Sequence, residues 1–134
     1  MGRRQAREGA LQMLYAWDIG NSQYELTEDT IKELMDLNQK DSEFMMNLVN
    51  EVISNSTIYD TAISKCLKGW EINRLSFLDR NILRIALVEM VKEGTPKQVV
   101  VNEAVEIAKV YSEDKSFKYI NGVLGNSELL KDFE

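Results

Sequence analysis

The first seven residues contain three arginines, Arg3, Arg4 and Arg7, at the start of a segment whose apolar spacing predicts a helix over residues 3–18. At about 100° per residue, the three side chains fall within roughly a third of the helix circumference and converge. A cation in the first turn opposes the helix dipole by about 0.3–1 kcal/mol, and phosphate groups, which bind guanidinium bidentately, would compensate that cost. The alternatives are ion pairs with Glu8 or with an acid from the C-terminal half of the chain, or a solvated basic end.

The composition excludes most catalytic chemistry. The 134-residue chain has no histidine and a single cysteine, so Ser-His-Asp triads and His-ligated metal sites are impossible. Neither of the Gly-rich phosphate loops, GxGxxG and GxxxxGK[ST], occurs in it. We therefore expect a protein that is not an enzyme, with no catalytic residues, no metal and no cofactor.

The location and overall charge also limit the possible partners. One cysteine fits a reducing cytoplasm, and no apolar run approaches the roughly 18 residues of a membrane span, so we expect a cytoplasmic protein without a membrane partner. The net charge of −6 argues against nucleic-acid binding over the whole surface. Any binding of nucleic acid would have to be local, as at the arginine cluster. Arg84 is expected in a structural ion pair with Glu103 or Glu89.

Apolar residues recur at helical spacing nearly throughout, which predicts an all-α fold. The first two helices are expected over residues 3–18 and 28–38, the second capped by Thr27. A third begins after Asp41 or Ser42, and the sequence Asn55-Ser56-Thr57 separates it from a short fourth helix that runs from Ile58 toward Gly69.

Gly69-Trp70 is the best internal boundary, which divides the chain into residues 1–68 and 69–134. Beyond it, a long helix ends at Gly94, and the next begins with Thr95 as its cap and Pro96 in its first turn. The last helix follows Ser112, with Glu113 and Asp114 in its first turn.

Four sequence blocks resemble one known family, the NusB family of transcription antitermination factors. They are RQAREGALQMLY at residues 4–15, LDRNILRIA at 78–86, VNEAVEIAK at 101–109 and YINGVL at 119–124. The resemblance covers nearly the whole chain, and it implies an all-α fold of about seven helices in two three-helix-type subdomains packed crosswise.

The resemblance also implies a function. Proteins of this family bind the boxA element of nascent ribosomal RNA together with NusE, a small-subunit ribosomal protein, in a complex with NusA, NusG and RNA polymerase that supports processive transcription. The family's arginine motif corresponds here to Arg3, Arg4 and Arg7. We expect the RNA surface to extend over Arg80, Lys115 and Lys118, and NusE to contact Asp79 and Asn73.

The sequence departs from the family at two positions: Lys115 and Gly125 stand where many members have aspartate. Three other functions remain open at this stage. The first is a helical module that regulates transcription through protein contacts without touching RNA. The second is the NusB-like module of ribosomal RNA methyltransferases, although 134 residues leave no room for a methyl-donor domain. The third is a carboxylate enzyme. Whether the protein is a monomer or a homodimer is also open.

Overall fold

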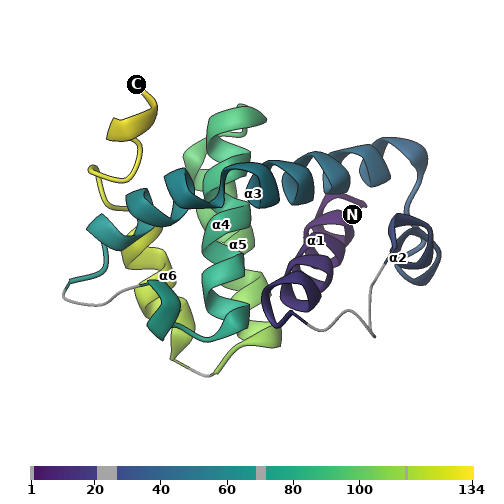
Figure 1. Ribbon diagram of the computed structural model, residues 1–134, viewed down its shortest axis with the longest axis horizontal. Helices are drawn as coiled ribbons and strands as arrows, with labels where there is room; N and C mark the ends of the chain where they lie inside the picture. Colours follow the sequence, from purple (N-terminus) through teal and green to yellow (C-terminus); the bar gives the residue numbers. More distant parts are fainter. Residues whose placement is uncertain (1, 21–26, 69–71, 114) are drawn as a thin grey trace.

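The computed structural model describes residues 2–20, 27–68, 72–113 and 115–134, and this part of the chain forms helices and 3₁₀ turns without a strand (Figure 1). The prediction of an all-α fold is therefore confirmed. The elements in chain order are α1 (Gly2–Asp18), α2 (Glu28–Leu34), α3 (Gln39–Lys65), the 3₁₀ turn η2 (Ile72–Arg74), α4 (Phe77–Lys92), α5 (Lys97–Tyr111), α6 (Ser116–Leu124) and the 3₁₀ turn η3 (Lys131–Phe133).

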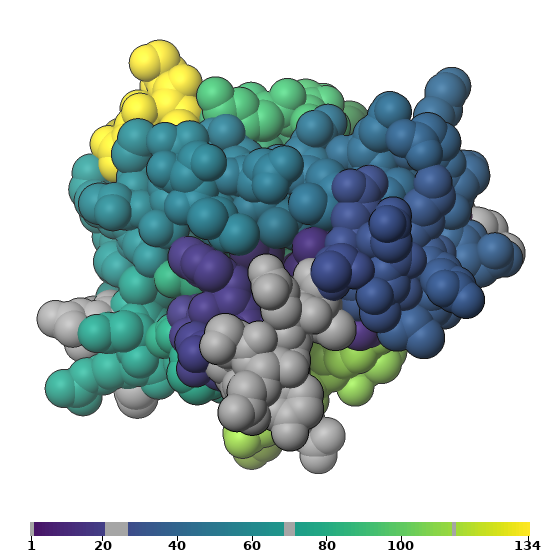
Figure 2. All heavy atoms as spheres, turned by 45° about the vertical axis from the view of Figure 1, so that its right-hand side comes forward, coloured from purple at the N-terminus to yellow at the C-terminus, as the bar shows by residue number. Residues whose placement is uncertain are grey.

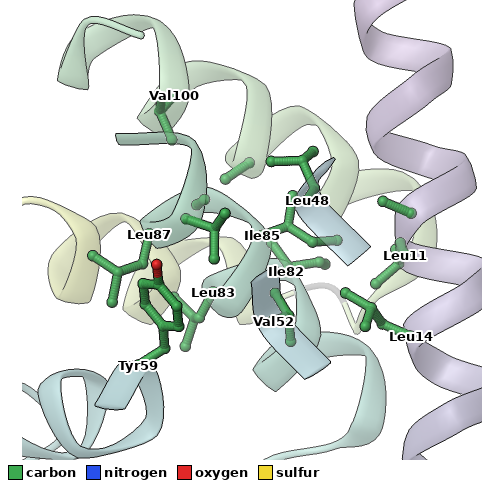
Figure 3. Close-up of a cluster of buried hydrophobic side chains, with 14 of the residues drawn as sticks. Leu11, Leu14, Leu48, Val52, Tyr59, Ile82, Leu83, Ile85, Leu87 and Val100 are labelled. Carbon is green, nitrogen blue, oxygen red and sulfur yellow. The ribbon is translucent and has the colours of Figure 1, made fainter. Parts of the chain in front are cut away.

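Helix α4 is the central element, because α1, α3, α5 and α6 all pack against it. Every residue from 81 to 89 is buried, so α4 is covered on all sides instead of along one stripe. Leu83 and Leu87 of α4 belong to one apolar core with side chains of α1, α3 and α5 (Figure 3). In the space-filling view, α1 is visible beneath α3 and beside α2 (Figure 2).

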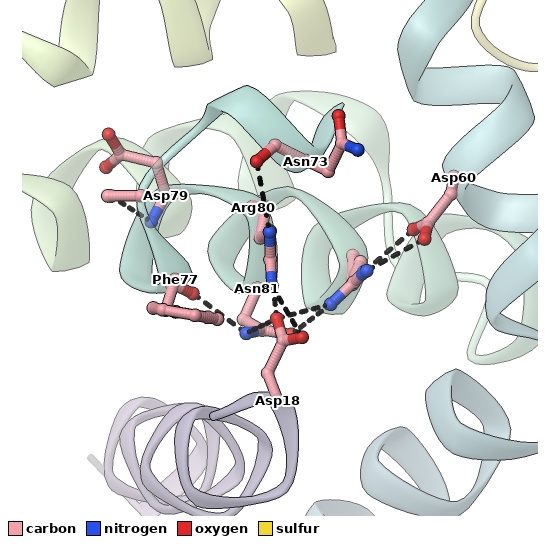
Figure 4. Close-up of polar contacts among 9 residues, drawn as sticks. Asp18, Asp60, Asn73, Phe77, Asp79, Arg80 and Asn81 are labelled. Atoms are coloured by element: carbon pink, nitrogen blue, oxygen red, sulfur yellow. Dashed lines mark hydrogen bonds and ion pairs between the residues drawn. The ribbon is translucent and has the colours of Figure 1, made fainter. Parts of the chain in front are cut away.

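The polar residues of this buried helix are paired with residues of other helices. The guanidinium of Arg84 donates from Nε and Nη2 to the two carboxylate oxygens of Asp60 in α3, at 2.7 Å each, and from Nη1 to Oδ2 of Asp18 in α1, at 2.8 Å (Figure 4). Asn81 also donates to Asp18, at 2.9 Å. Burial acts to raise the pKa of Asp18, but the hydrogen bond from Arg80, the charge of Arg84 and the amide of Asn81 outweigh it and hold that pKa below its ordinary value.

The expected pairing of Arg84 with Glu103 or Glu89 is wrong. Arg84 and Glu89 are five positions apart on α4, which places them about 140° apart around the helix, so they face different neighbours. Glu89 pairs with Arg7 of α1 instead, at 2.6 Å. Helical spacing shows which residues share a face of one helix, but it does not show which other helix covers that face.

Two expected helix ends are confirmed. The hydroxyl oxygen of Thr27 accepts a hydrogen bond from the backbone N–H of Thr30 at 3.1 Å and caps α2. Gly94 follows α4 with φ of +67°, the left-handed conformation that glycine adopts without steric cost. Helix α2 ends at Leu34 and not near residue 38, because Asp36 takes a left-handed φ of 53°.

The expected third and fourth helices form one continuous element, α3, which is kinked where the break was expected. Its cap is Asn38, whose side-chain oxygen accepts from the N–H of Asp41 at 2.8 Å, so neither Asp41 nor Ser42 is the cap. The expected break at residues 55–57 is a kink, with φ −130° and ψ 29° at Asn55. With the kinked α3 counted as one element, the described residues contain six α-helices; about seven were expected, and the kink divides α3 into the two parts that were expected as separate helices.

Two later helix starts also differ from expectation. Pro96, and not Thr95, is the cap of α5, and it makes no side-chain capping bond. Helix α6 begins at Ser116, so Glu113 precedes it and is not in its first turn. Asp114 and the proposed boundary at Gly69-Trp70 lie outside the described residues, and the division into residues 1–68 and 69–134 stays a prediction.

Gly9 allows a close approach of α1 to its neighbours, and this generates a stability prediction. A Cβ at Gly9 would lie 2.7 Å from Ile31 Cγ2 and 2.7 Å from Met45 Sδ, too close without movement of both neighbours. Gly9→Ala should lower the free energy of unfolding by about 1–3 kcal/mol, despite the better helix propensity of alanine. Gly122 of α6 has no atom within 4 Å of such a Cβ, so Gly122→Ala should raise it by about 0.5–1 kcal/mol. Urea unfolding of both variants measures the difference; stabilisation by Gly9→Ala would contradict the packing described here.

Candidate nucleic-acid interface

Arg7 is the inner member of the N-terminal arginine cluster, and only 8% of it is exposed. Its Nε and Nη2 donate to the two carboxylate oxygens of Glu89 in α4, at 2.7 and 2.6 Å. Its Nη1 donates to Glu103 of α5 at 3.3 Å. With these three bonds and almost no exposure, Arg7 anchors α1 on α4 and α5 and does not present its charge to solvent. The expectation that Arg7 contacts RNA directly does not agree with this placement.

Arg3 and Arg4 form the outer part of the cluster, and each side chain is 50% exposed. Arg4 donates from Nε and Nη2 to the two oxygens of Glu103, at 2.9 and 2.7 Å. Arg3 approaches Asp41 of α3 at 3.6 Å and lies 4.1 Å from the centroid of the Phe44 ring. We call these two residues the Arg3–Arg4 surface.

Each arginine of the cluster has a carboxylate neighbour. The hydrogen bond from Arg4 lowers the pKa of Glu103 below its ordinary value despite partial burial, so this carboxylate is charged at neutral pH. One alternative from the sequence was that the arginines form ion pairs with acids from the C-terminal half of the chain. The ion pairs with Glu103 and Glu89 are of this kind. The structure therefore brings Arg4 and Arg7 together at Glu103 and directs Arg3 toward α3.

The other expected RNA-binding cations lie on other elements, and Arg80 is far from the Arg3–Arg4 surface. Arg80 donates to Asp18 from Nε and Nη2 at 2.6 and 2.7 Å, at the opposite end of α1 (Figure 4). At 1.5 Å per residue, Arg4 and Asp18 are about 21 Å apart along the helix. Lys115 precedes α6 and Lys118 lies in it, and both are exposed.

The two residues expected to contact a partner protein differ in exposure. Asn73 is exposed in η2, but only 5% of Asp79 is exposed. The carboxylate of Asp79 accepts hydrogen bonds from Ser112, Tyr119 and Ser116, the last at 3.0 Å, and so joins α4 to α6 and to the residue that ends α5. Figure 4 shows it pointing away from Asp18.

Asp79 is therefore a structural residue of the free protein, and its expected role as a direct contact does not agree with its burial. The sequence contains a local signal that places Asp79 in the first turn of a helix. Ser76 and Asp79 have the spacing of a helix N-cap and the third residue of that helix, and the N–H of Asp79 donates to the Ser76 hydroxyl at 3.1 Å.

An apolar groove is the feature that the sequence analysis missed. It has a volume of about 320 Å³, and Leu11, Tyr15, Ile19, Leu78 and Tyr111 contribute to its walls. Tyr15, Ile19 and the nearby Phe77 are exposed, and the Tyr15 and Phe77 rings meet edge to face at 6.1 Å. Exposed apolar side chains were not separable from core residues in the sequence, because both follow the same helical spacing.

Among the described residues, no three acidic or cysteine side chains are grouped so that they could hold a metal ion. None of the helices in the described ranges has the length and apolar character that crossing a membrane requires.

Sequence comparisons identify relatives over most of the chain. The NusB family profile matches residues 4–128. The transcription antitermination protein NusB of Bacillus cereus (strain ATCC 10987) is 41% identical over 128 residues, which cover 94% of this chain and 96% of the relative. The protein of the same name from Chloroherpeton thalassium is 40% identical; the match covers 92% of this chain, which spans 60% of that relative's length.

Solved structures agree with these relatives. NusB of T. maritima superimposes with a TM-score of 0.78 at 33% identity, covering 91% of this chain and 87% of that one. A structure of the antitermination factors NusB and NusE in complex with double-stranded RNA matches with a TM-score of 0.77 at 28% identity, covering 98% of each chain. The match to a family of antitermination factors also supports the expectation that the protein is not an enzyme. The fold, the sequence blocks and these relatives together lead to one conclusion: the chain belongs to the NusB family.

Proposed function

We propose that the protein is a cytoplasmic antitermination factor that binds boxA RNA of nascent ribosomal RNA transcripts together with NusE and supports processive transcription in a complex with NusA, NusG and RNA polymerase. The observation that carries the proposal is the Arg3–Arg4 surface, two half-exposed guanidinium groups on the first helix of a NusB-family chain. The similarity to a NusB solved with NusE and RNA supports both partners.

In this proposal Arg3 and Arg4 bind RNA phosphates. Arg7 does not touch the RNA; it fixes α1 on α4 and α5 and so positions the other two arginines. Lys115 and Lys118 provide a second, separate phosphate contact near α6. Arg80 contributes less, because Asp18 already holds two of its nitrogens. The net charge of −6 repels the strand from the rest of the surface, so the protein alone should bind RNA weakly.

NusE is proposed to dock on the apolar groove beside Tyr15 and Phe77. Exposed aromatic and aliphatic side chains gathered at one place are typical of protein contacts. Arg80 connects Asn73 to this groove: it donates to the Asn73 carbonyl at 3.4 Å and lies 4.3 Å from the Phe77 ring centroid. Docking there would place the two proteins side by side on one RNA and raise the affinity through their joint footprint.

The RNA proposal is tested by replacing Arg3 and Arg4 together with alanine. The double variant should bind a boxA RNA more weakly and show a log–log salt slope smaller by about 1.4, which corresponds to two phosphates of a single strand. The control is Arg74→Ala with Lys92→Ala, which removes two exposed charges elsewhere. Fluorescence anisotropy at two salt concentrations measures both. Equal affinity of both double variants at low salt would remove the RNA role of α1 and favour the alternative of regulation through protein contacts alone.

The groove proposal is tested with Ile19→Glu, which adds a charge at an exposed apolar wall. Affinity for NusE should fall at least about fivefold, because an interface residue that matters contributes more than about 1 kcal/mol. Leu34→Glu is the matched control, since Leu34 is 69% exposed on α2 and does not line the groove. Calorimetric titration of NusE into each variant gives the comparison. The same loss in both variants, or in neither, would exclude the groove as the docking site.

A further inference from the structure

The Nε–Nη2 edge of Arg4, one of the edges through which a guanidinium can bind a phosphate with two bonds, is occupied in the free protein. Arg4 binds Glu103 through Nε and Nη2, at 2.9 and 2.7 Å, which is the two-bond geometry that guanidinium also uses for phosphate oxygens. Arg3 differs, because its contact with Asp41 is a single approach at 3.6 Å. A phosphate can therefore reach Arg3 with little competition, but to bind the Nε–Nη2 edge of Arg4 it has to displace a carboxylate.

Glu103 has a second cation that stays in place when Arg4 leaves. Arg7 Nη1 lies 3.3 Å from Glu103 Oε1, and two bonds to Glu89 fix the rest of the Arg7 guanidinium. This second partner matters because the Glu103 side chain is only 21% exposed, and a partly buried carboxylate without a cation would be costly. Arg7 thus reduces the cost of releasing Arg4.

We infer that Glu103 is a positioning residue that sets RNA affinity by competing with phosphate for Arg4. On binding, Arg4 exchanges the Glu103 carboxylate for an RNA phosphate, and Glu103 is left to Arg7. The inference rests on the proposed function, since it concerns the same RNA surface. The competition also favours RNA over free phosphate. A free phosphate that displaces Glu103 gains no other contact, whereas an RNA strand binds several cations at once, and these additional contacts offset the loss of the Glu103 ion pair.

The test is RNA affinity of Glu103→Gln, which keeps the shape of the side chain and removes its charge. We expect the affinity for a boxA RNA to rise about two- to fivefold, the range that corresponds to an exposed ion pair. Glu106→Gln is the matched control: Glu106 lies one turn further along α5, half-exposed, and pairs with Lys109 at 3.6 Å. It removes the same charge without touching a hydrogen bond of Arg4, so its effect should be smaller.

A double-mutant cycle shows whether Glu103 acts through Arg4. In an Arg4→Ala background, Glu103→Gln should change RNA affinity no more than Glu106→Gln does. Three results would each overturn the inference: weaker binding by Glu103→Gln, an equal rise in Glu106→Gln, or an undiminished rise when Arg4 is absent. If Glu103→Gln unfolds, Glu103→Asp replaces it: this variant keeps a charge for Arg7 and shortens the reach to Arg4, so it should show a smaller rise, and unchanged or weaker binding would overturn the inference.

The controls also separate this inference from the proposed function. If the wild-type protein does not bind the RNA at all, with or without NusE, the proposed function fails. If it binds and Arg4→Ala weakens binding, while Glu103→Gln leaves the affinity unchanged, only the competition by Glu103 is contradicted.

Discussion

The structure depends on the pairing of polar side chains on a helix that is buried on all sides. Asp79, Asn81, Arg84 and Glu89 of α4 are each less than a tenth exposed. A charge in such a place is strongly destabilising without a partner, and α4 itself cannot supply all the partners. They come from α1, α3, α6 and Ser112, the residue after α5. In the described part of the chain every buried side-chain nitrogen or oxygen has a hydrogen-bond partner. The apolar core alone would allow these helices to slide or rotate, whereas the paired groups specify one arrangement.

This pairing divides the N-terminal arginines into two roles. Helix α1 is held to α4 near its start by Arg7 and Glu89 and at its end by Asp18 and Arg84. The anchor near the start orients the first turn, so that Arg3 and Arg4 are half-exposed at the edge between α3 and α5. The three arginines, although close in sequence, therefore have different roles. Arg7 fixes the helix, and the half-exposed Arg3 and Arg4 can be reached by an anionic partner.

Much of the fold followed from the sequence, because it depends on local rules. Helical spacing predicted the all-α class, and Thr27 and Gly94 were recognised as helix ends from their residue types. The break expected at Asn55 is present as a kink, and side-chain contacts across it join the two parts of α3. Tyr59 beyond the kink donates to Glu51 before it at 2.7 Å, and Asn55 donates to the same carboxylate. The site was less predictable. The arginine cluster was found from its charge and spacing, but the burial of Arg7 and Asp79 depends on helices distant in sequence.

The division of the arginines can be observed directly by NMR of the side-chain Nε–H groups, with each signal assigned from a single Arg→Lys variant. On addition of boxA RNA, the signals of Arg3 and Arg4 should shift, because their partners change from carboxylate to phosphate. The signals of Arg7 and Arg84 should stay in place, because these two nearly buried guanidinium groups keep their carboxylate partners. A shift of Arg7 comparable to that of Arg4, or bound RNA with no change at Arg3 and Arg4, would contradict the account.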